Sequence, residues 1–207
     1  LVNGIQAGGG RIFCDAQVTT VETGKQTKVE TSQGCIVTAD AVVIATNTPI
    51  NNMVTIHTKQ AAYISYVIGA AMPPGSIEPA LFWDTLDPYH YVRIQRQSSP
   101  QGGEEDILIV GGEDHKAGQA DDGEVRYARL EAWARARFPM MKDVTFRWSG
   151  QVMESVDGLA FIGRNPGDAD NVYIATGDSG MGMTHGTIAG LLITDPVSYT
   201  HLRAHET

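Results

Sequence analysis

Metal-ligating residue pairs are scarce in this sequence. Its only two cysteines are Cys14 and Cys35, and neither has a second cysteine at CxxC spacing or a histidine at ligand spacing. Structural zinc sites and iron–sulfur clusters need several such residues close together. The sequence therefore predicts no metal site, and we expect both thiols to act as small apolar residues in a reducing compartment.

Long apolar runs and an excess of basic residues are also missing. No run approaches the roughly 20 apolar residues of a membrane span, and no basic-then-apolar leader is recognisable. The formal net charge is −9, and both nucleic acid and anionic membranes repel a negatively charged protein. We therefore expect a cytoplasmic protein that binds neither nucleic acid nor a membrane.

Short β-branched segments near the start predict a small antiparallel meander. Turn residues such as Gly24 and Gly34 separate three expected strands, which cover residues 11–22, 27–31 and 35–39. Residues 41–46 then form a continuous apolar run, which is typical of a buried parallel strand. The meander is thus expected to lead into a central strand.

The middle of the chain has a different pattern. Apolar segments separated by loops predict antiparallel strands at residues 61–70, 81–84, 89–97, 106–111 and 144–153. One amphipathic helix is expected over 124–138, where Pro139 stops it. The fold class is therefore α/β, of the mixed α+β kind, with an antiparallel sheet inserted between two parts of another domain.

The most informative segment is 171–193, NVYIATGDSGMGMTHGTIAGLLI, which reads as a strand, a glycine-rich turn and a helix. Gly177, Gly180 and Gly182 allow a sharp turn and close approach of a ligand. A helix beginning near Met183 or Thr184 offers unpaired N–H groups and a positive dipole end to an electron-rich partner. Many α/β folds contain such a turn without a ligand, so the motif alone leaves a structural role open.

Three segments in order resemble flavoprotein oxidoreductases of the D-amino-acid oxidase superfamily, such as glycine and sarcosine oxidases. They are VVIATNTP at 42–49, WSGQVMESVDGLAFIG at 148–163 and the segment at 171–193. The resemblance covers roughly residues 1–195. It implies a partial Rossmann-like FAD-binding domain, residues 1–52 and 148–195, and a substrate domain, residues 53–147. It also implies that FAD accepts hydride from an amine, an amino acid or a related small molecule, and it leaves the electron acceptor open.

The resemblance implies a set of cofactor contacts. Val18 would lie near the adenine end, and Ala45 and Thr46 near the pyrophosphate and ribityl region. The isoalloxazine or ribityl part would meet Gly177, Gly180, Met181, Gly182, Met183 and Thr184. Each of these residues is also explained by a role in a strand or turn. For the two methionines we expect the backbone to contact flavin and the side chains to fill the core.

Substrate contacts are less defined. Amino-acid oxidases of this group carry an arginine before an Asp-Gly turn to hold the substrate carboxylate; counted back from Asp157-Gly158, that position is Val152. Candidate substrate-binding residues are Tyr89, Tyr91 and Arg93, and further cations or pocket residues are Lys59, Arg147 and His90. No catalytic residue is assigned, because His57 and His185 are expected to be structural. Glu113-Asp114-His115 is interpreted as the polar end of a hairpin, whose side chains point to opposite faces.

The GxGxxG fingerprint that holds a dinucleotide pyrophosphate is absent, and Gly8-Gly9-Gly10 lies too near the start to supply it. We hypothesise that this chain alone binds FAD poorly; a stoichiometric flavin spectrum of the purified chain would contradict this. Some longer relatives with a similar C-terminal FAD segment continue into a Rieske iron–sulfur domain, whose Cys/His pairs are absent here. Residues 196–207 resemble a translated library adapter, so we expect no function for His201 or His205. A non-catalytic flavin- or nucleotide-binding module and an inactive truncated chain remain alternatives.

Overall fold

The computed structural model describes residues 1–51, 54–98 and 102–198. The chain divides into unit 1, residues 1–59 and 157–207, and unit 2, residues 60–156. The expected boundaries, 53 and 147, differ from these because two long strands pair as far as Gln60 and Ser155. Residues 148–156 therefore belong with the inserted sheet. The expected tail falls partly on the last helix, which runs to Ser198, and its residues 199–207 lie outside the described residues.

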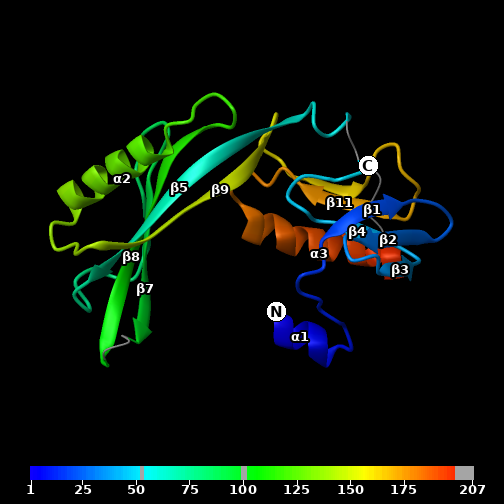
Figure 1. The fold of residues 1–207 in the computed structure, drawn as a ribbon, viewed down its shortest axis with the longest axis horizontal. Coiled ribbons are helices and arrows are strands. Elements are labelled where there is room, and N and C mark those ends of the chain that lie inside the picture. Colours follow the sequence, from blue (N-terminus) through cyan, green and yellow to red (C-terminus); the bar gives the residue numbers. More distant parts are fainter. Residues whose placement is uncertain (52–53, 99–101, 199–207) are drawn as a thin grey trace, which may run out of the picture. The chain divides into compact units, whose positions relative to one another are not determined.

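Unit 1 begins with a short helix and a three-stranded meander (Figure 1). Helix α1 covers Val2–Ala7, and the antiparallel strands are β1 (Val18–Glu22), β2 (Thr27–Thr31) and β3 (Ile36–Ala39). The expected strand at 11–22 is wrong for residues 11–17. The backbone at Asp15 has a φ of 53°, which interrupts an extended strand, and β2 pairs with β1 only from Val18 onward.

A second sheet in unit 1 joins segments that are far apart in sequence. Its strand order is β10 (Phe161–Arg164), β11 (Val172–Thr176) and β4 (Val42–Ile44). Strand β11 runs parallel to β4 and antiparallel to β10. Val172 and Ile174 pack with Ile44 and Ile56 on one face, as the period of two in a strand requires. This face of the sheet is therefore part of the hydrophobic core of unit 1.

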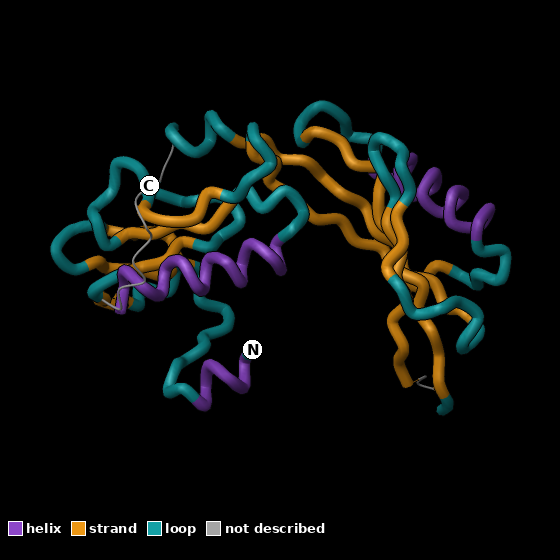
Figure 2. The backbone as a smooth tube through the Cα atoms, turned by 180° about the vertical axis from the view of Figure 1, so that it is seen from behind, coloured by secondary structure: helices purple, strands orange, loops and turns teal. Residues whose placement is uncertain are grey.

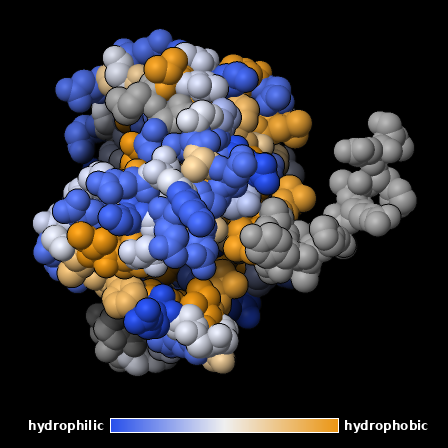
Figure 3. Space-filling view, turned by 90° about the vertical axis from the view of Figure 1, so that its right-hand side faces the viewer, coloured by the Kyte–Doolittle hydropathy of each residue, from blue (hydrophilic) through white to orange (hydrophobic). Residues whose placement is uncertain are grey.

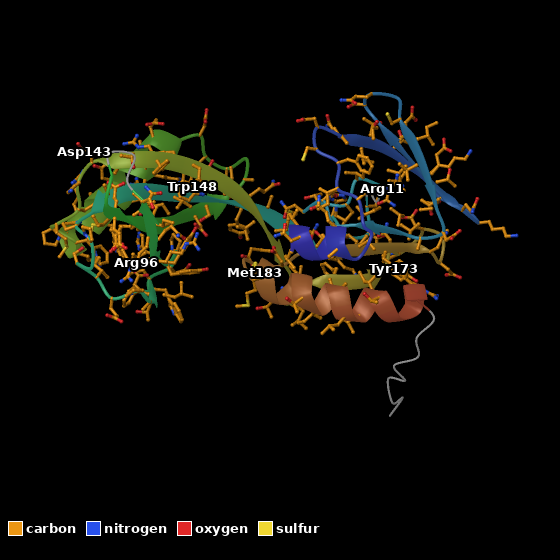
Figure 4. The ribbon with its side chains drawn as sticks, turned by 90° about the horizontal axis from the view of Figure 1, so that it is seen from below. Arg11, Arg96, Asp143, Trp148, Tyr173 and Met183 are labelled. Carbon is orange, nitrogen blue, oxygen red and sulfur yellow. The ribbon has the colours of Figure 1, made fainter. Side chains whose placement is uncertain are left out.

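Helix α3 (Gly182–Ser198) covers the other face of this sheet. Tyr173 of β11 packs against Ala189 and Ile193 of α3, and Figure 4 shows Tyr173 beside that helix. The helix buries only this narrow stripe, since Leu191 and Leu192 are 66% and 56% exposed. The contact nevertheless fixes where the first turn of α3 lies relative to the end of β11.

Unit 2 is a five-stranded antiparallel sheet with one helix (Figure 2). The strand order is β6 (Leu81–Trp83), β7 (Tyr91–Ser98), β8 (Glu104–Lys116), β5 (Gln60–Met72) and β9 (Val144–Ser155). Helix α2 (Gly123–Arg137) buries Leu130 and Ala134 against Ile68, Leu108 and Val110 of the sheet. The amphipathic pattern predicted this stripe. The opposite face of the sheet, which we call the open face, does not contact α2.

A β-bulge in β8 changes which side chains reach the open face. Between the pairs Tyr66↔Gly112 and Ile64↔His115, β5 has one residue, Ser65, and β8 has two, Glu113 and Asp114. Glu113 has a φ of 58°. The expectation that β8 ends at Gly111 is wrong, because pairing resumes beyond the bulge. Glu113-Asp114-His115 therefore lies inside a strand and not at a hairpin end.

Two consecutive glycines of β8 each accommodate a ring from the start of β7. A Cβ atom at Gly111 would lie 2.0 Å from Cζ of Tyr91, and one at Gly112 would lie 2.8 Å from Cδ2 of His90. The Tyr91 ring therefore lies directly on the backbone at Gly111. The His90 ring packs on the α2 side, where it stacks on Trp133 with a centroid distance of 4.3 Å.

No helix within the described part of the chain is both long and apolar enough to cross a membrane. Apolar side chains are nevertheless exposed in both units. Ile36 of unit 1 is 64% exposed and Trp83 of unit 2 is 70% exposed. On the face shown in Figure 3, hydrophobic residues form separate groups between hydrophilic ones.

Gly111→Ala should lower the free energy of unfolding by about 1–3 kcal/mol, because the added methyl group must displace the Tyr91 ring. Gly150→Ala on β9 is the matched control, since no heavy atom lies within 4 Å of its added Cβ. The control should be neutral or slightly stabilising, because alanine restricts the unfolded chain. Urea denaturation followed by circular dichroism measures both variants, and equal midpoints would contradict the proposed ring position.

Candidate functional site

The glycine-rich turn connects β11 to α3 through a left-handed backbone. Gly177, Ser179 and Gly180 have φ values of 69°, 47° and 77°, which glycine adopts without steric cost and serine does not. The Met181 N–H donates to the Asp178 carbonyl at 2.8 Å, and the His185 N–H donates to the Met181 carbonyl at 3.0 Å. The strand, turn and helix predicted for 171–193 are therefore present, with the helix beginning at Gly182.

A cavity of about 290 Å³ lies beside this turn. It is lined by residues from β4 and the loop after it, from β10 and β11, and from the first turns of α3. They are Ala45, Asn47, Ala160, Ile162, Ala175, Thr176, Gly177, Asp178, Gly182, His185 and Gly186. Most of these side chains are small, so the cavity brings a ligand close to the backbone.

The parallel pairing of β4 and β11 places the carboxyl ends of both strands at this cavity. The Thr176 hydroxyl donates a hydrogen bond to the carbonyl of Asn47, across the two strand ends. Asn47 has a φ of 65°, and the Thr46 hydroxyl donates to the Thr48 carbonyl at 2.7 Å. Ligands of open α/β sheets commonly bind at the carboxyl ends of the strands.

The start of α3 combines a helix N-terminus with two polar side chains. The Asp178 carboxylate packs against Gly182, where a Cβ atom would lie 2.5 Å from Oδ2. His185 Nδ1 lies 3.1 Å from the Asp178 carbonyl, so Nδ1–H donates and Nε2 remains for another partner. The first amides of a helix have no intrahelical acceptor. The cavity wall thus offers N–H donors, a carboxylate and an imidazole.

The cavity includes three of the nine residues predicted to contact the cofactor, Ala45, Gly177 and Gly182. Val18 lies on β1, and Thr46, Gly180, Met181, Met183 and Thr184 adjoin the cavity-lining segments without lining the cavity. Met181 and Met183 are 63% and 86% exposed, and Figure 4 places Met183 on the first turn of α3. The expectation that their side chains fill the core is therefore wrong.

Sequence reasoning missed Asn47, Asp178 and the cavity position of His185. Asp178 had one available signal, since it directly follows a glycine at the end of a buried strand. Asn47 had none, because a polar residue in a turn after a strand is ordinary. His185 was expected to be structural, and its bond to the Asp178 carbonyl fits that role, but its ring also lines the cavity.

In unit 2, all three of the predicted substrate residues lie at the open face. The Tyr91 hydroxyl is 3.2 Å from the Ser65 hydroxyl, and the Tyr91 and Tyr89 ring centroids are 6.2 Å apart. Burial raises the pKa of the Tyr91 phenol, an effect that its bond to Ser65 opposes. Arg93 follows two residues later on the same face and is exposed. Tyr89, Tyr91 and Arg93 are thus close neighbours.

His90 lies between the two tyrosines in sequence but on the other side of the sheet. Its Nδ1–H donates to Asp84 Oδ2 at 2.9 Å, and its Nε2 is 3.5 Å from Glu113 Oε1. Burial alone would raise the pKa of Asp84, but hydrogen bonds from the His90 backbone and ring lower it below its ordinary value. His90 therefore anchors the start of β7 and does not line the open face.

The three residues 113–115 have separate partners, as alternation along a strand predicts. Glu113 approaches His90, Asp114 bonds to Ser65, and His115 Nε2 is 3.0 Å from the Tyr66 hydroxyl. Among the described residues, no group of three His, Cys, Asp or Glu side chains has the arrangement of a metal site.

Comparison with known proteins identifies the family. The model of the DAO family, described as FAD dependent oxidoreductase, matches residues 1–195. The chain belongs to this FAD dependent oxidoreductase family. The expected superfamily is confirmed. The chain is also 23% identical over 190 residues to the Bacillus subtilis (strain 168) protein YhfW, which is named as a Rieske 2Fe-2S iron-sulfur protein. That match covers 91% of this chain and 36% of YhfW.

Solved structures of DAO-like enzymes have the same fold. The glycine oxidase of Bacillus cereus ATCC 14579 matches with a TM-score of 0.72 at 15% identity, over 98% of this chain and 55% of that one. The glycine oxidase of Geobacillus kaustophilus matches with a TM-score of 0.68 at 17% identity, over 96% of this chain and 52% of that one. The L-proline dehydrogenase of P. horikoshii matches with a TM-score of 0.68 at 16% identity, over 97% of this chain and 54% of that one. The expected mixed fold is confirmed, and the chain spans about half the length of these proteins.

Asp84→Asn should make stability less dependent on pH. A carboxyl group whose folded pKa is lowered stabilises the fold above its unfolded pKa, near 3.8, and this contribution is lost as pH falls through the folded pKa. At pH 7 the variant should be less stable by about 1–3 kcal/mol. The difference should shrink as pH falls through the lowered pKa of Asp84. Urea denaturation at several pH values measures it.

Asp143→Asn is the control for this comparison, since Asp143 is an exposed carboxylate in the loop before β9. Its pH profile should follow that of the unaltered protein. A profile of Asp84→Asn that is parallel to both would show that the Asp84–His90 pair does not contribute as described.

Proposed function

We propose that FAD binds at the cavity beside α3 and that the protein oxidises a small amine or amino acid by hydride transfer to it. The cavity at the joined ends of β4 and β11 is the observation that carries this proposal. Membership of a family described as FAD dependent oxidoreductase supports the cofactor. Relatives named glycine oxidase and L-proline dehydrogenase support the substrate class.

The residues present fit part of a dinucleotide. About 290 Å³ is space for one portion of FAD, and glycines at 177, 182 and 186 let it reach the backbone. The first amides of α3 can donate to electron-rich ring or phosphate oxygens. The Asp178 carboxylate can accept from a ribityl or ribose hydroxyl. We assign Val18, Ala45, Thr46, Gly180, Met181, Met183 and Thr184 to the same cofactor region.

FAD, when bound, supplies the hydride-accepting chemistry. The contribution of this chain is electrostatic: the positive end of the α3 dipole stabilises negative charge at a ligand beside it. His185 can donate or accept through Nε2, depending on its protonation. Unit 1 is accordingly the FAD-binding part, and unit 2 the substrate-binding part, with Tyr89, Tyr91 and Arg93 as contacts.

The full-length gene product tests this proposal. Its visible spectrum should contain flavin bands, and a panel of amines and amino acids under anaerobic conditions should include one that bleaches them. Bound flavin that no substrate bleaches would support a non-catalytic flavin-binding module in place of an oxidase. Absence of flavin from a folded product would contradict both readings.

Gly186→Val should raise the Kd for FAD by about tenfold or more, equivalent to about 1.4 kcal/mol, because its side chain fills the cavity. Gly190→Val, about one turn further along α3, is the matched control. Neither glycine has a heavy atom within 4 Å of an added Cβ, and only Gly186 lines the cavity. Titration of the apoprotein with FAD, followed by flavin fluorescence, measures the affinities. Equal Kd values for the two variants would place FAD elsewhere.

A further inference from the structure

A polar group of side chains lies on the open face of unit 2, around Ser65. The Ser65 hydroxyl bonds to Asp114 from β8 and lies 3.2 Å from the Tyr91 hydroxyl. Since Ser65 pairs with Gly150 and Ala61 with Glu154, the period of two puts Glu154 on this face as well. Tyr89 is 49% exposed. Partial burial raises the pKa of its phenol, and the charges of Asp114 and Glu154 raise it further. We call Ser65, Tyr89, Tyr91, Asp114 and Glu154 the open-face cluster.

The two carboxylates of this cluster lack a cationic partner. Among the described residues, neither Asp114 nor Glu154 forms a salt bridge, and Asp114 Oδ1 is buried without accepting a hydrogen bond. A buried acceptor left unpaired costs about 1–3 kcal/mol. Burial raises the pKa of Asp114, and the charge of Glu154 adds to the rise. The cluster is therefore stabilised by any donor that brings positive charge to it.

Other charged groups near the cluster do not fill this role. His90 and His115 influence Asp114, but their rings bond to Asp84 and Tyr66 on the α2 side. Arg93 lies on the open face and acts on the Tyr91 phenol, but it forms no salt bridge with either carboxylate. Lys116, two residues beyond Asp114 and opposite Tyr63, is on the same face and is exposed. Val152, opposite Tyr63 and on the same face as Glu154, is apolar. Among the described residues, no lysine or arginine therefore lies within salt-bridge distance of Asp114 or Glu154.

We infer that the open-face cluster binds a positively charged nitrogen of the substrate, such as a protonated amine, and that it selects against a carboxylate at the same place. Glu154 and Asp114 accept hydrogen bonds from the ammonium group, and the faces of Tyr89 and Tyr91 attract it by cation–π interaction. Tyr89 is the member of the cluster most exposed to solvent. The inference rests on the proposed function, since it narrows the substrate class.

Isothermal titration calorimetry of the full-length gene product at pH 7 tests the inference with two probes of similar shape. Benzylamine is a cation at this pH and benzoate is an anion. The Kd for benzylamine should be lower by about tenfold or more, or about 1.4 kcal/mol. Asp114→Asn and Glu154→Gln should each raise the benzylamine Kd by about five- to tenfold, because each removes one negative charge.

Two further variants complete the test. Glu104→Gln removes an exposed carboxylate from the other end of β8 and should leave both Kd values unchanged. Val152→Arg puts a cation beside Glu154 and should reverse the preference toward benzoate. Circular dichroism checks the fold of each variant, and if Asp114→Asn does not fold, Glu154→Gln and Val152→Arg decide the outcome.

Benzoate binding as tight as benzylamine binding would overturn the inference, and so would failure to bind either probe. A preference that Glu154→Gln and Val152→Arg leave unchanged would overturn it as well. The flavin spectrum separates this result from the proposed function. A charge preference that depends on these residues, found in a protein without flavin, supports the inference and contradicts FAD binding. Bound flavin in a protein that lacks this charge preference contradicts the inference alone.

Discussion

The parallel pairing of β4 with β11 is the constraint on which the candidate cofactor site depends. Three residue pairs, Val42 with Val172, Val43 with Tyr173 and Ile44 with Ile174, join segments that are separated by the whole of unit 2 in sequence. Burial of Ile44, Val172 and Ile174 holds them together. Because both strands end at the same edge, the loop after β4 meets the glycine-rich turn after β11. The cavity exists only as a consequence of that meeting.

The geometry of unit 2 depends on two consecutive glycines of β8, Gly111 and Gly112, because neither has a side chain. The rings of Tyr91 and His90 take the vacant volume on opposite sides of the sheet. His90 is held by Asp84, Glu113 and Trp133 on the α2 side. The hydrogen bond between Tyr91 and Ser65 then has a defined place on the open face. A buried polar network on one side thereby determines the geometry of the other.

The sequence predicted elements whose signal is local. The apolar run and glycines at 171–193 gave β11, the turn and α3, and the stripe of 124–138 gave α2 with Leu130 and Ala134 buried. It did not predict that β8 continues past Gly111, because two consecutive glycines often end a strand and because a bulge depends on the partner strand. Asn47 and Asp178 were missed because their importance comes from non-local pairing. The exposure of Met181 and Met183 was missed because apolar character alone does not determine burial.

The extra residue in β8 has a consequence for how charge is distributed on the sheet. Before the bulge, even-numbered residues such as Leu108 and Val110 lie under α2, whereas beyond it Asp114 is on the opposite side. Loss of Glu113 would restore strict alternation and would leave Asp114 directly opposite Ser65, on the open face. The extra residue thus gives this short stretch an acidic side chain on each face of the sheet: Glu113 approaches His90 on the α2 side, and Asp114 bonds to Ser65 on the open side.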